Sequence, residues 1–189
     1  MLRAMAGAPA GLSMAGTSLL AVADNPAEAA AAVHDGAALV DFGTAGPAAI
    51  AEFRTRHPGT LVCAACEQAD VVRDPAMALR TGAILVCTDP AAAISAGLPA
   101  ARLLVQVSPA RLAAASAAGV ATLVDLADQR VSRGADLQDA GTLAIAAICA
   151  WLGATVIRTS HPGPMRRAVD MAESIRGVRP PARAARGLG

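Results

Sequence analysis

The chain has 189 residues, a length that suits one domain able to bury a sizeable core. Its formal net charge of +1 argues against an electrostatic nucleic-acid binder, and no apolar run reaches the roughly 18 residues that a membrane span needs. Lysine and tyrosine are both absent, which excludes any mechanism that needs a lysine ammonium or a phenol. Four cysteines without a secretory context predict free thiols in a reducing compartment. We therefore expect a cytoplasmic protein that binds neither nucleic acid nor membrane.

At the amino end, several Gly, Pro and Ser residues interrupt the only apolar stretch. We interpret residues 1–16 as a disordered leader. One domain is then expected over 17–178. The basic, Pro- and Gly-rich segment 179–189 is expected to be a disordered or surface-lying tail.

Between these ends, short apolar runs alternate with alanine-rich stretches of helical composition. Glycine precedes four of the runs, as expected where a helix ends and the chain turns into a strand. Proline next to a capping residue begins several of the helical stretches. The seven runs that we interpret as strands are 18–24, 37–43, 60–66, 83–89, 102–108, 121–127 and 154–160.

Near-continuous apolar strands that alternate with helices predict a parallel sheet covered on both faces. The regular βα units favour an α/β fold of the (β/α) TIM-barrel type over an open doubly wound sheet, although periodicity alone does not decide whether the sheet closes. Seven strands are clear, and an eighth is only weakly indicated near Val131. Because a complete eightfold barrel usually needs about 250 residues, we expect a shortened one.

In such folds the chemistry lies at the carboxyl ends of the strands. A polar or sulfur-containing residue stands at that end of each expected strand. These candidates are Asp24, Asn25, Asp41, Cys66, Cys87, Thr88, Asp89, Gln106, Ser108, Asp125, Asp128, Arg158, Ser160 and His161.

The last strand ends in a cationic corner formed by Arg158, Ser160 and His161, just before a helix. An arginine and a histidine beside the first free N–H groups of a helix are suited to bind a phosphate or another anion. The alternative is structural: Arg158 pairs with Asp125 or another carboxylate, while Ser160 or His161 caps the helix.

Three of the candidate carboxylates, Asp24, Asp89 and Asp125, have the chemistry to bind Mg²⁺ or to hydrogen-bond a heterocycle. Asp24 and Asp89 both precede helices, so the alternative is that they are helix caps.

The cysteines allow a third kind of site. Cys63 and Cys66 form a Cys-x-x-Cys pair at an expected strand-to-helix turn, which suits a redox pair. Together with Cys87 and His161 they also make a candidate zinc site. The alternative is that each is a small hydrophobic residue in an alanine-rich core.

Read together, the runs resemble the dihydropteroate synthase family, the pterin-binding TIM barrels of folate biosynthesis. The segment that begins "GADLQDAGTLAIAAICAWLGATVIRTSHPG" is similar to the family's last helix, final strand and closing helix. "AEAAAAVHDGAALVDFG" is similar to its second strand, with Asp41 in register, and "TLVCAAC…TGAILVCTD" and "AAGVATLVDLA" are similar to the third, fourth and sixth strands. The chain looks like a divergent, shortened homologue of actinobacterial type.

The resemblance implies a reaction that joins a pterin methyl pyrophosphate to p-aminobenzoate, with pyrophosphate leaving through Mg²⁺. It implies that Asp125 is the sixth-strand acid that recognises the pterin and that Arg158 is the phosphate-binding arginine. The family's histidine two places beyond that arginine falls on Ser160, with His161 one place late.

Elsewhere the family's pattern is broken. Its third-strand acid falls on Ala65, and its fourth-strand Asn-Asp pair falls on Cys87 and Thr88, with Asp89 one place late. Asn25 matches a magnesium-binding asparagine, but the long loop that follows it in the family is absent. The seventh strand and its lysine are expected to be missing.

Losing one preorganised electrostatic or acid–base group costs about 10²- to 10⁴-fold in rate, and several are lost here. We therefore expect a dihydropteroate synthase-like, pterin-binding protein with an eroded and largely inactive site, whose partners are a pterin or another anionic small molecule. The alternative is a non-catalytic structural or regulatory paralogue that forms a homodimer or pairs with an intact synthase. A weaker alternative is a thiol or zinc protein that uses Cys63, Cys66 and Cys87.

Overall fold

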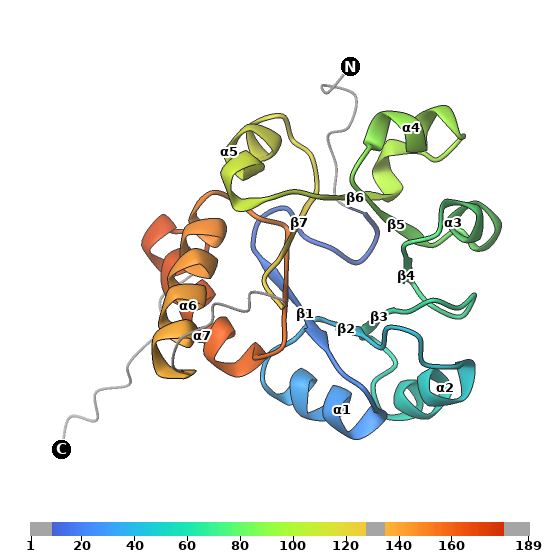
Figure 1. The fold of residues 1–189 in the computed structure, drawn as a ribbon, viewed down its shortest axis with the longest axis horizontal. Helices are drawn as coiled ribbons and strands as arrows, with labels where there is room; N and C mark the ends of the chain where they lie inside the picture. Colours follow the sequence, from blue (N-terminus) through green and yellow to red (C-terminus); the bar gives the residue numbers. More distant parts are fainter. Residues whose placement is uncertain (1–8, 128–134, 180–189) are drawn as a thin grey trace.

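A computed structural model describes residues 9–127 and 135–179. Parallel strands form a closed barrel in which β1 pairs with β2 and so on round to β8, which pairs with β1 (Figure 1). The predicted TIM-type α/β barrel is therefore confirmed, and the sheet closes. The strands are β1 (Ser18–Val22), β2 (Leu39–Asp41), β3 (Leu61–Cys63), β4 (Val71–Val72), β5 (Ile84–Cys87), β6 (Leu103–Gln106), β7 (Thr122–Asp125) and β8 (Val156–Thr159).

Helices surround the barrel, and proline occupies the first position of most of them, where its missing N–H and fixed φ cost nothing. Before α3 the Asp74 carboxylate accepts hydrogen bonds from two backbone N–H groups of the first turn. Gly82 ends the same helix with φ +82°, a conformation that favours glycine. The helices are α1 (Pro26–His34), α2 (Pro47–Arg56), α3 (Pro75–Thr81), α4 (Pro90–Ser95), α5 (Pro109–Ala117), α6 (Ala135–Trp151) and α7 (Pro162–Arg176), and a 3₁₀ turn lies at Ala100–Arg102.

The eighth strand of the barrel is β4, which the sequence did not indicate. It follows β3 after the short segment 64–70, in which no helix forms. The Asp70 carboxylate holds the end of this segment against β3 and α2, because it accepts hydrogen bonds from the Val62 N–H and from Arg54. The weak eighth strand expected near Val131 lies outside the described residues. Since β7 pairs directly with β8, however, the barrel closes without a strand between them.

The barrel interior is filled by alternate side chains of the strands, because successive residues of a strand point to opposite faces. The intervening side chains, such as Val40, Leu85 and Ile157, pack outward against the helices. The interior cluster is Leu20, Leu39, Cys63, Val71, Ile84, Val86, Leu104, Ala121, Leu123 and Val156. Above it, at the carboxyl ends, the same alternation brings polar residues to the barrel mouth.

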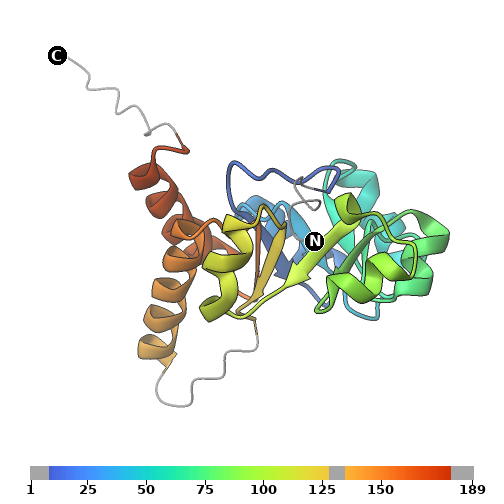
Figure 2. The same cartoon turned by 90° about the horizontal axis from the view of Figure 1, so that it is seen from above.

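The amino ends of the strands are covered by the segment that precedes β1. Leu12 packs against the interior cluster, and the Thr17 hydroxyl donates to the Ala154 carbonyl oxygen at 2.8 Å. Residues 9–16, which belong to the expected leader, thus lie against the barrel, whereas residues 1–8 and most of the expected tail lie outside the described residues. On the outside of the barrel, α6 and α7 lie together at one side (Figure 2). Within the described ranges, no helix is both long and apolar enough to span a bilayer.

Candidate functional site

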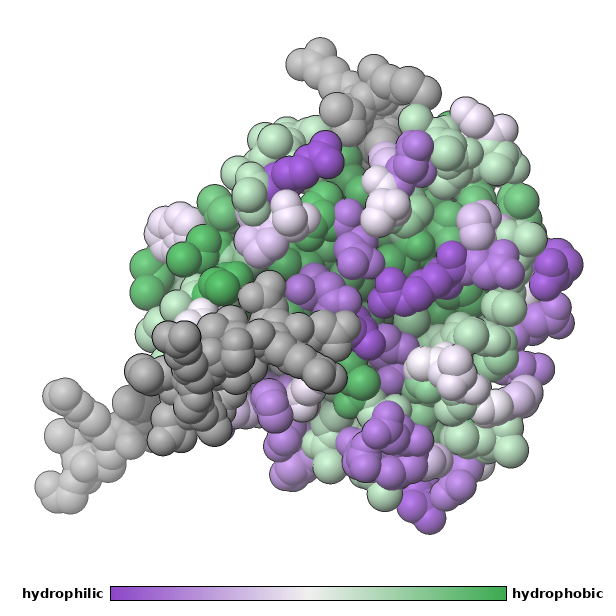
Figure 3. Space-filling model, viewed as in Figure 1, coloured by the Kyte–Doolittle hydropathy of each residue, from purple (hydrophilic) through white to green (hydrophobic). Residues whose placement is uncertain are grey.

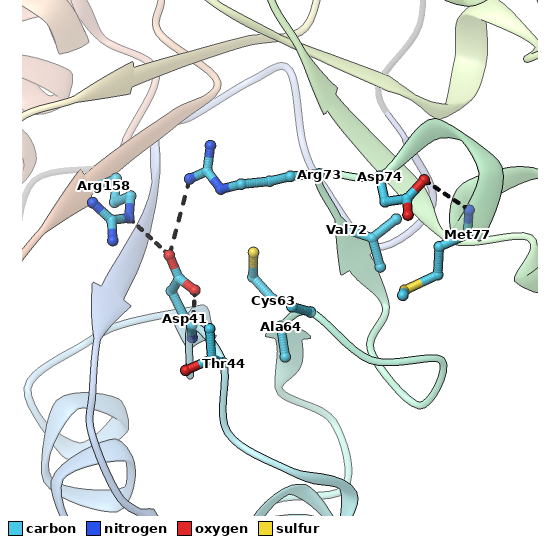
Figure 4. A pocket seen from close by; sticks show the side chains of 11 residues that line it. Asp41, Thr44, Cys63, Ala64, Val72, Arg73, Asp74, Met77 and Arg158 are labelled. Atoms are coloured by element: carbon cyan, nitrogen blue, oxygen red, sulfur yellow. Dashed lines mark hydrogen bonds and ion pairs between the residues drawn. The ribbon is translucent and has the colours of Figure 1, made fainter.

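The barrel mouth holds a set of polar side chains from strand ends. Asp41 ends β2, Gln106 ends β6 and Asp125 ends β7, while Arg158 lies on β8 and Arg73 directly follows β4. Each stands two residues beyond an interior apolar residue of its strand, so the alternation that builds the core also places these five in one layer. Figure 4 shows Asp41, Arg73 and Arg158 pointing toward one another.

Arg158 is held between two carboxylates. Its Nε donates to Asp41 Oδ2 at 2.8 Å, and its Nη1 lies 3.2 Å from Asp125 Oδ2. The side chain is 16% exposed and that of Asp41 only 5%. Burial opposes the charge on Arg158, but the hydrogen bond that Arg158 donates to Asp41 and the charge of Asp125 outweigh it and raise the pKa of the guanidinium.

This geometry contains the pairing with Asp125 that the structural alternative anticipated, since Asp125 and Arg158 are opposite each other in the β7–β8 register. It adds Asp41, one of the other strand-end carboxylates, which the sequence did not single out as a partner of Arg158. The two residues are 117 positions apart, and only closure of the barrel brings β2 and β8 onto the two sides of β1.

Arg73 is a second cation in the mouth, and sequence reasoning missed it. Its Nη1 donates to Gln106 Oε1 at 3.1 Å, and its Nη2 lies 4.0 Å from the same Asp41 oxygen that binds Arg158. The side chain is 45% exposed. The signal was the triplet Val-Val-Arg at 71–73, a very short apolar run that ends in a charge, like the ends of the recognised strands.

A cavity of about 580 Å³ opens beside these groups, on the β2–β3–β4 side of the mouth (Figure 4). Arg158 and Arg73 supply N–H donors to it, and Asp41 and Asp74 supply acceptors. Its size is that of a small-molecule site. The lining residues are Asp41, Gly43, Thr44, Cys63, Ala64, Ala65, Val72, Arg73, Asp74, Met77 and Arg158.

Asp125 is not among the residues that line this cavity. It contacts Arg158, which does line the cavity. A second cavity of about 520 Å³, over β5 and β6, is bordered by Thr88, Asp89 and Gln106, and it shares Arg73 with the first. Arg73 therefore lies at the boundary between the two cavities.

Ser160 and His161 are both exposed, and neither lines either cavity. The backbone N–H of His161 donates to Thr159 Oγ1 at 3.0 Å. His161 occupies the N-cap position of α7, but its side chain makes no capping hydrogen bond. The structure thus brings together Arg158 and carboxylates, and leaves the other two members of the expected cationic corner at the rim.

Asn25 and Asp89 both cap helices. The Asn25 Oδ1 accepts from two backbone N–H groups of α1, and its Nδ2 donates to Glu28 at 2.8 Å. Asp89 Oδ1 accepts from two N–H groups of α4, while Asp24 is exposed. Because its carbonyl oxygen is engaged in this way, Asn25 does not fit the Mg²⁺ ligand that the resemblance implied.

The cysteines point in different directions. Cys63 faces the barrel interior, whereas Cys66 and Cys87 pack outward against the outer cluster. Burial, with the nearby Asp41 charge, raises the pKa of the Cys63 thiol to about 12, so it stays protonated at neutral pH. Among the described residues, no three His, Cys, Asp or Glu side chains lie where they could share a metal ion. This arrangement does not favour the thiol or zinc alternative.

The comparisons with known proteins agree with the barrel. No protein-family model matches the sequence, and no curated protein matches it. Among solved structures, the chain is similar to a dihydropteroate synthase of Yersinia pestis, with a TM-score of 0.74 and 16% identity over 92% of this chain and 99% of that one. It is also similar to Rv1207 of Mycobacterium tuberculosis, with a TM-score of 0.70 and 21% identity over 90% and 97%.

A third similar structure is the dihydropteroate synthase of Xanthomonas albilineans in complex with 7,8-dihydropteroate, with a TM-score of 0.72 and 15% identity over 89% of this chain and 96% of that one. The chain has a dihydropteroate synthase-like fold. The expected correspondence changes at two strands, because β4 had not been counted. Cys87 and Thr88 stand at the end of the fifth strand and not the fourth, and Asp125 ends the seventh and not the sixth. The seventh strand is therefore present, and an aspartate stands at its end.

Proposed function

We propose that the cavity at the barrel mouth binds a pterin or a closely related anionic heterocycle, and that the chain no longer carries out the synthase reaction efficiently. The observation that carries the proposal is the cavity of about 580 Å³ between Asp41, Arg73 and Arg158, at the strand ends of a dihydropteroate synthase-like barrel. Similar structures were solved with a pterine–sulfa conjugate and with 7,8-dihydropteroate.

The chemistry of the cavity suits such a ligand. A pterin presents neighbouring N–H donors and a keto oxygen on one edge, which match carboxylate acceptors and a guanidinium. Asp41 is committed to Arg158 and to the Gly43 N–H at 2.9 Å. The Asp74 carboxylate uses one oxygen, Oδ1, for its helix cap. Arg73, which is the more exposed of the two arginines, supplies the positive charge that reaches an incoming anion.

The loss of efficient catalysis follows from the residues themselves. The chain contains no lysine to stand at the seventh strand, which ends in Asp125, and the family's third-strand acid falls on Ala65. Each such group is worth about 10²- to 10⁴-fold in rate. Contacts that bind a ligand tolerate substitution better than the set of groups that stabilises a transition state. Ligand binding is therefore retained after efficient catalysis has been lost.

Isothermal titration of the protein with a pterin pyrophosphate tests the binding. We expect saturable heat for the wild type and at least about tenfold weaker binding for Arg73→Ala, since one charge-assisted hydrogen bond is worth about 1.5–3 kcal/mol. Arg111→Ala, which removes an exposed arginine from α5, is the matched control and should bind like the wild type. No heat at millimolar ligand would contradict the proposal.

Turnover is measured separately, with pterin pyrophosphate, p-aminobenzoate and Mg²⁺, by detecting dihydropteroate. We expect a rate at least about 10⁴-fold below that of a dihydropteroate synthase assayed in parallel, because more than one group is lost. A comparable rate would show that this chain has rebuilt its site, and that part of the proposal would fall.

A further inference from the structure

Gln106, the last residue of β6, holds Arg73 in place at the barrel mouth. Figure 3 shows hydrophilic residues in a band across the middle of the molecule, over the barrel strands of Figure 1. The Gln106 Oε1 accepts a hydrogen bond from Arg73 Nη1 at 3.1 Å, while Arg73 Nη2 lies 4.0 Å from Asp41 Oδ2. In the barrel, β6 and β2 lie two strands from β4, one on each side. The guanidinium of Arg73 is therefore held by an amide on one side and a carboxylate on the other.

The two arginines of the mouth differ in how far their charge is compensated. Arg158 is mostly buried and contacts two carboxylates, those of Asp41 at 2.8 Å and of Asp125 at 3.2 Å. Among the described residues, Arg73 contacts the Gln106 amide and an Asp41 oxygen that already accepts the hydrogen bond from Arg158. The Arg73 side chain is also more exposed than that of Arg158. Arg73 thus keeps a positive charge that an incoming anion can meet.

The neutrality of the Gln106 side chain preserves this charge. An amide oxygen accepts a hydrogen bond from a guanidinium and so orients it, but the amide carries no charge. A glutamate at the same position has nearly the same shape and accepts the same hydrogen bond. Its carboxylate, however, forms a charge-assisted pair with the arginine and compensates the positive charge. The residue at position 106 therefore determines how much of the Arg73 charge an anion meets.

We propose that Gln106 is a positioning residue for anion binding, which orients the Arg73 guanidinium at the boundary of the two cavities and leaves its charge uncompensated. This role rests on the proposed function in one respect, because it takes the barrel mouth as the place where the anion binds. It adds that position 106 sets the affinity for the charged group of the ligand. Gln106 acts through Arg73 and needs no contact with the ligand itself.

Calorimetric titration of the full chain with inorganic pyrophosphate, without Mg²⁺, tests this role independently of the heterocycle. We expect the wild type to bind pyrophosphate in the millimolar range. Gln106→Glu should bind it at least about tenfold more weakly, because the new carboxylate compensates Arg73 and repels the anion. Gln68→Glu is the matched control, since it adds the same charge at an exposed position that lines neither cavity of the mouth, and it should bind like the wild type.

Gln106→Ala separates the charge from the shape of the side chain. It removes the orienting amide but adds no charge, so pyrophosphate affinity should fall only about threefold, the usual value of one neutral hydrogen bond. Binding to Gln106→Ala should also weaken with added salt as steeply as binding to the wild type, because the Arg73 charge remains. Far-UV circular dichroism verifies that each variant folds. Where Gln106→Glu does not fold, the small loss expected for Gln106→Ala and its salt dependence still decide the matter.

Equal pyrophosphate affinities of the wild type and Gln106→Glu would overturn the proposal, as would no binding to the wild type at up to about 20 mM pyrophosphate. A loss in Gln106→Ala as large as in Gln106→Glu would also overturn it, because that result is expected if Gln106 only supports the structure. Failure of the proposed function gives a different result. Pyrophosphate then binds as predicted, but the pterin pyrophosphate binds no more tightly than pyrophosphate alone.

Discussion

At the scale of single residues, the central feature is a guanidinium shared between carboxylates. Arg158 contacts Asp41 and Asp125, and Arg73 approaches Asp41 from the opposite side of the mouth. Two arginines that share one nearly buried aspartate leave spare N–H donors toward the cavity. Asp41 thus orients both cations, and its substitution should weaken ligand binding and lower the stability of the fold.

Asp41→Asn should lower the free energy of unfolding by about 2 kcal/mol, because it removes the charge that compensates a mostly buried arginine. Asp125→Asn is the comparison, and it should cost less, since Asp125 is 22% exposed and its contacts to Arg158 are longer. Urea unfolding at neutral pH measures both. A larger effect of Asp125→Asn would show that Asp125, and not Asp41, is the main partner of Arg158, and equal effects would contradict the predicted order.

The buried thiols make a second prediction at this scale. Burial raises the pKa of Cys63 to about 12 and that of Cys149 to about 11, from an ordinary value of 9.0. In native protein at pH 8, both should resist iodoacetamide while the less buried Cys66 reacts, as read by peptide mass spectrometry. Rapid native-state alkylation of Cys63 would revive the thiol alternative.

The raised pKa of Cys63 also predicts how the free energy of unfolding changes at alkaline pH. Above pH 9 the unfolded chain releases the Cys63 proton while the folded chain retains it, so the stabilisation present below pH 9 is lost as pH rises towards 12. Cys63→Ala should flatten this part of the curve of unfolding free energy against pH. An unchanged alkaline slope would mean that the thiol titrates normally in the folded protein.

At the scale of elements, several candidate site residues are accounted for by helix capping. Asp74, Asp89 and Asn25 each accept hydrogen bonds from two backbone N–H groups of the helix that follows. The sequence showed that Asp89 precedes a helix, but it could not decide between cap and ligand, because both roles use the same carboxylate.

Asp89→Ala should lower the free energy of unfolding by about 1 kcal/mol, the usual value of an N-cap. Asp24→Ala is the matched control and should change little, because Asn25 caps the neighbouring helix and Asp24 is exposed. Thermal unfolding compares the two. A variant of Asp89 that keeps full stability but loses ligand affinity would return this residue to the list of binding groups.

The elements also show what sequence reasoning could and could not predict. Seven of the strands were indicated because each is a run of apolar residues that follows a glycine or a polar turn. The strand β4 has only two residues and no helix between it and β3, so it carries no periodic signal. Arg73 was missed for the same reason, since it is positioned by β4.

At the scale of the whole molecule, barrel closure creates the site. Asp41, Arg73, Asp125 and Arg158 come from four strands spread through the chain, and no local motif contains more than one of them. The sequence could therefore predict the fold class and single out Arg158, Asp125 and Asp41, but not the ion-pair network or the position of the cavity. Asp125 was expected to meet a ligand, yet it faces Arg158 from outside the cavity.

The most direct test of the account is a crystal structure of the protein soaked with a pterin and pyrophosphate. We predict ligand density in the cavity between Asp41, Arg73 and Arg158, with a negatively charged group within hydrogen-bond distance of Arg73. Density elsewhere at the barrel mouth, or an unchanged cavity under conditions in which solution binding is saturated, would contradict it.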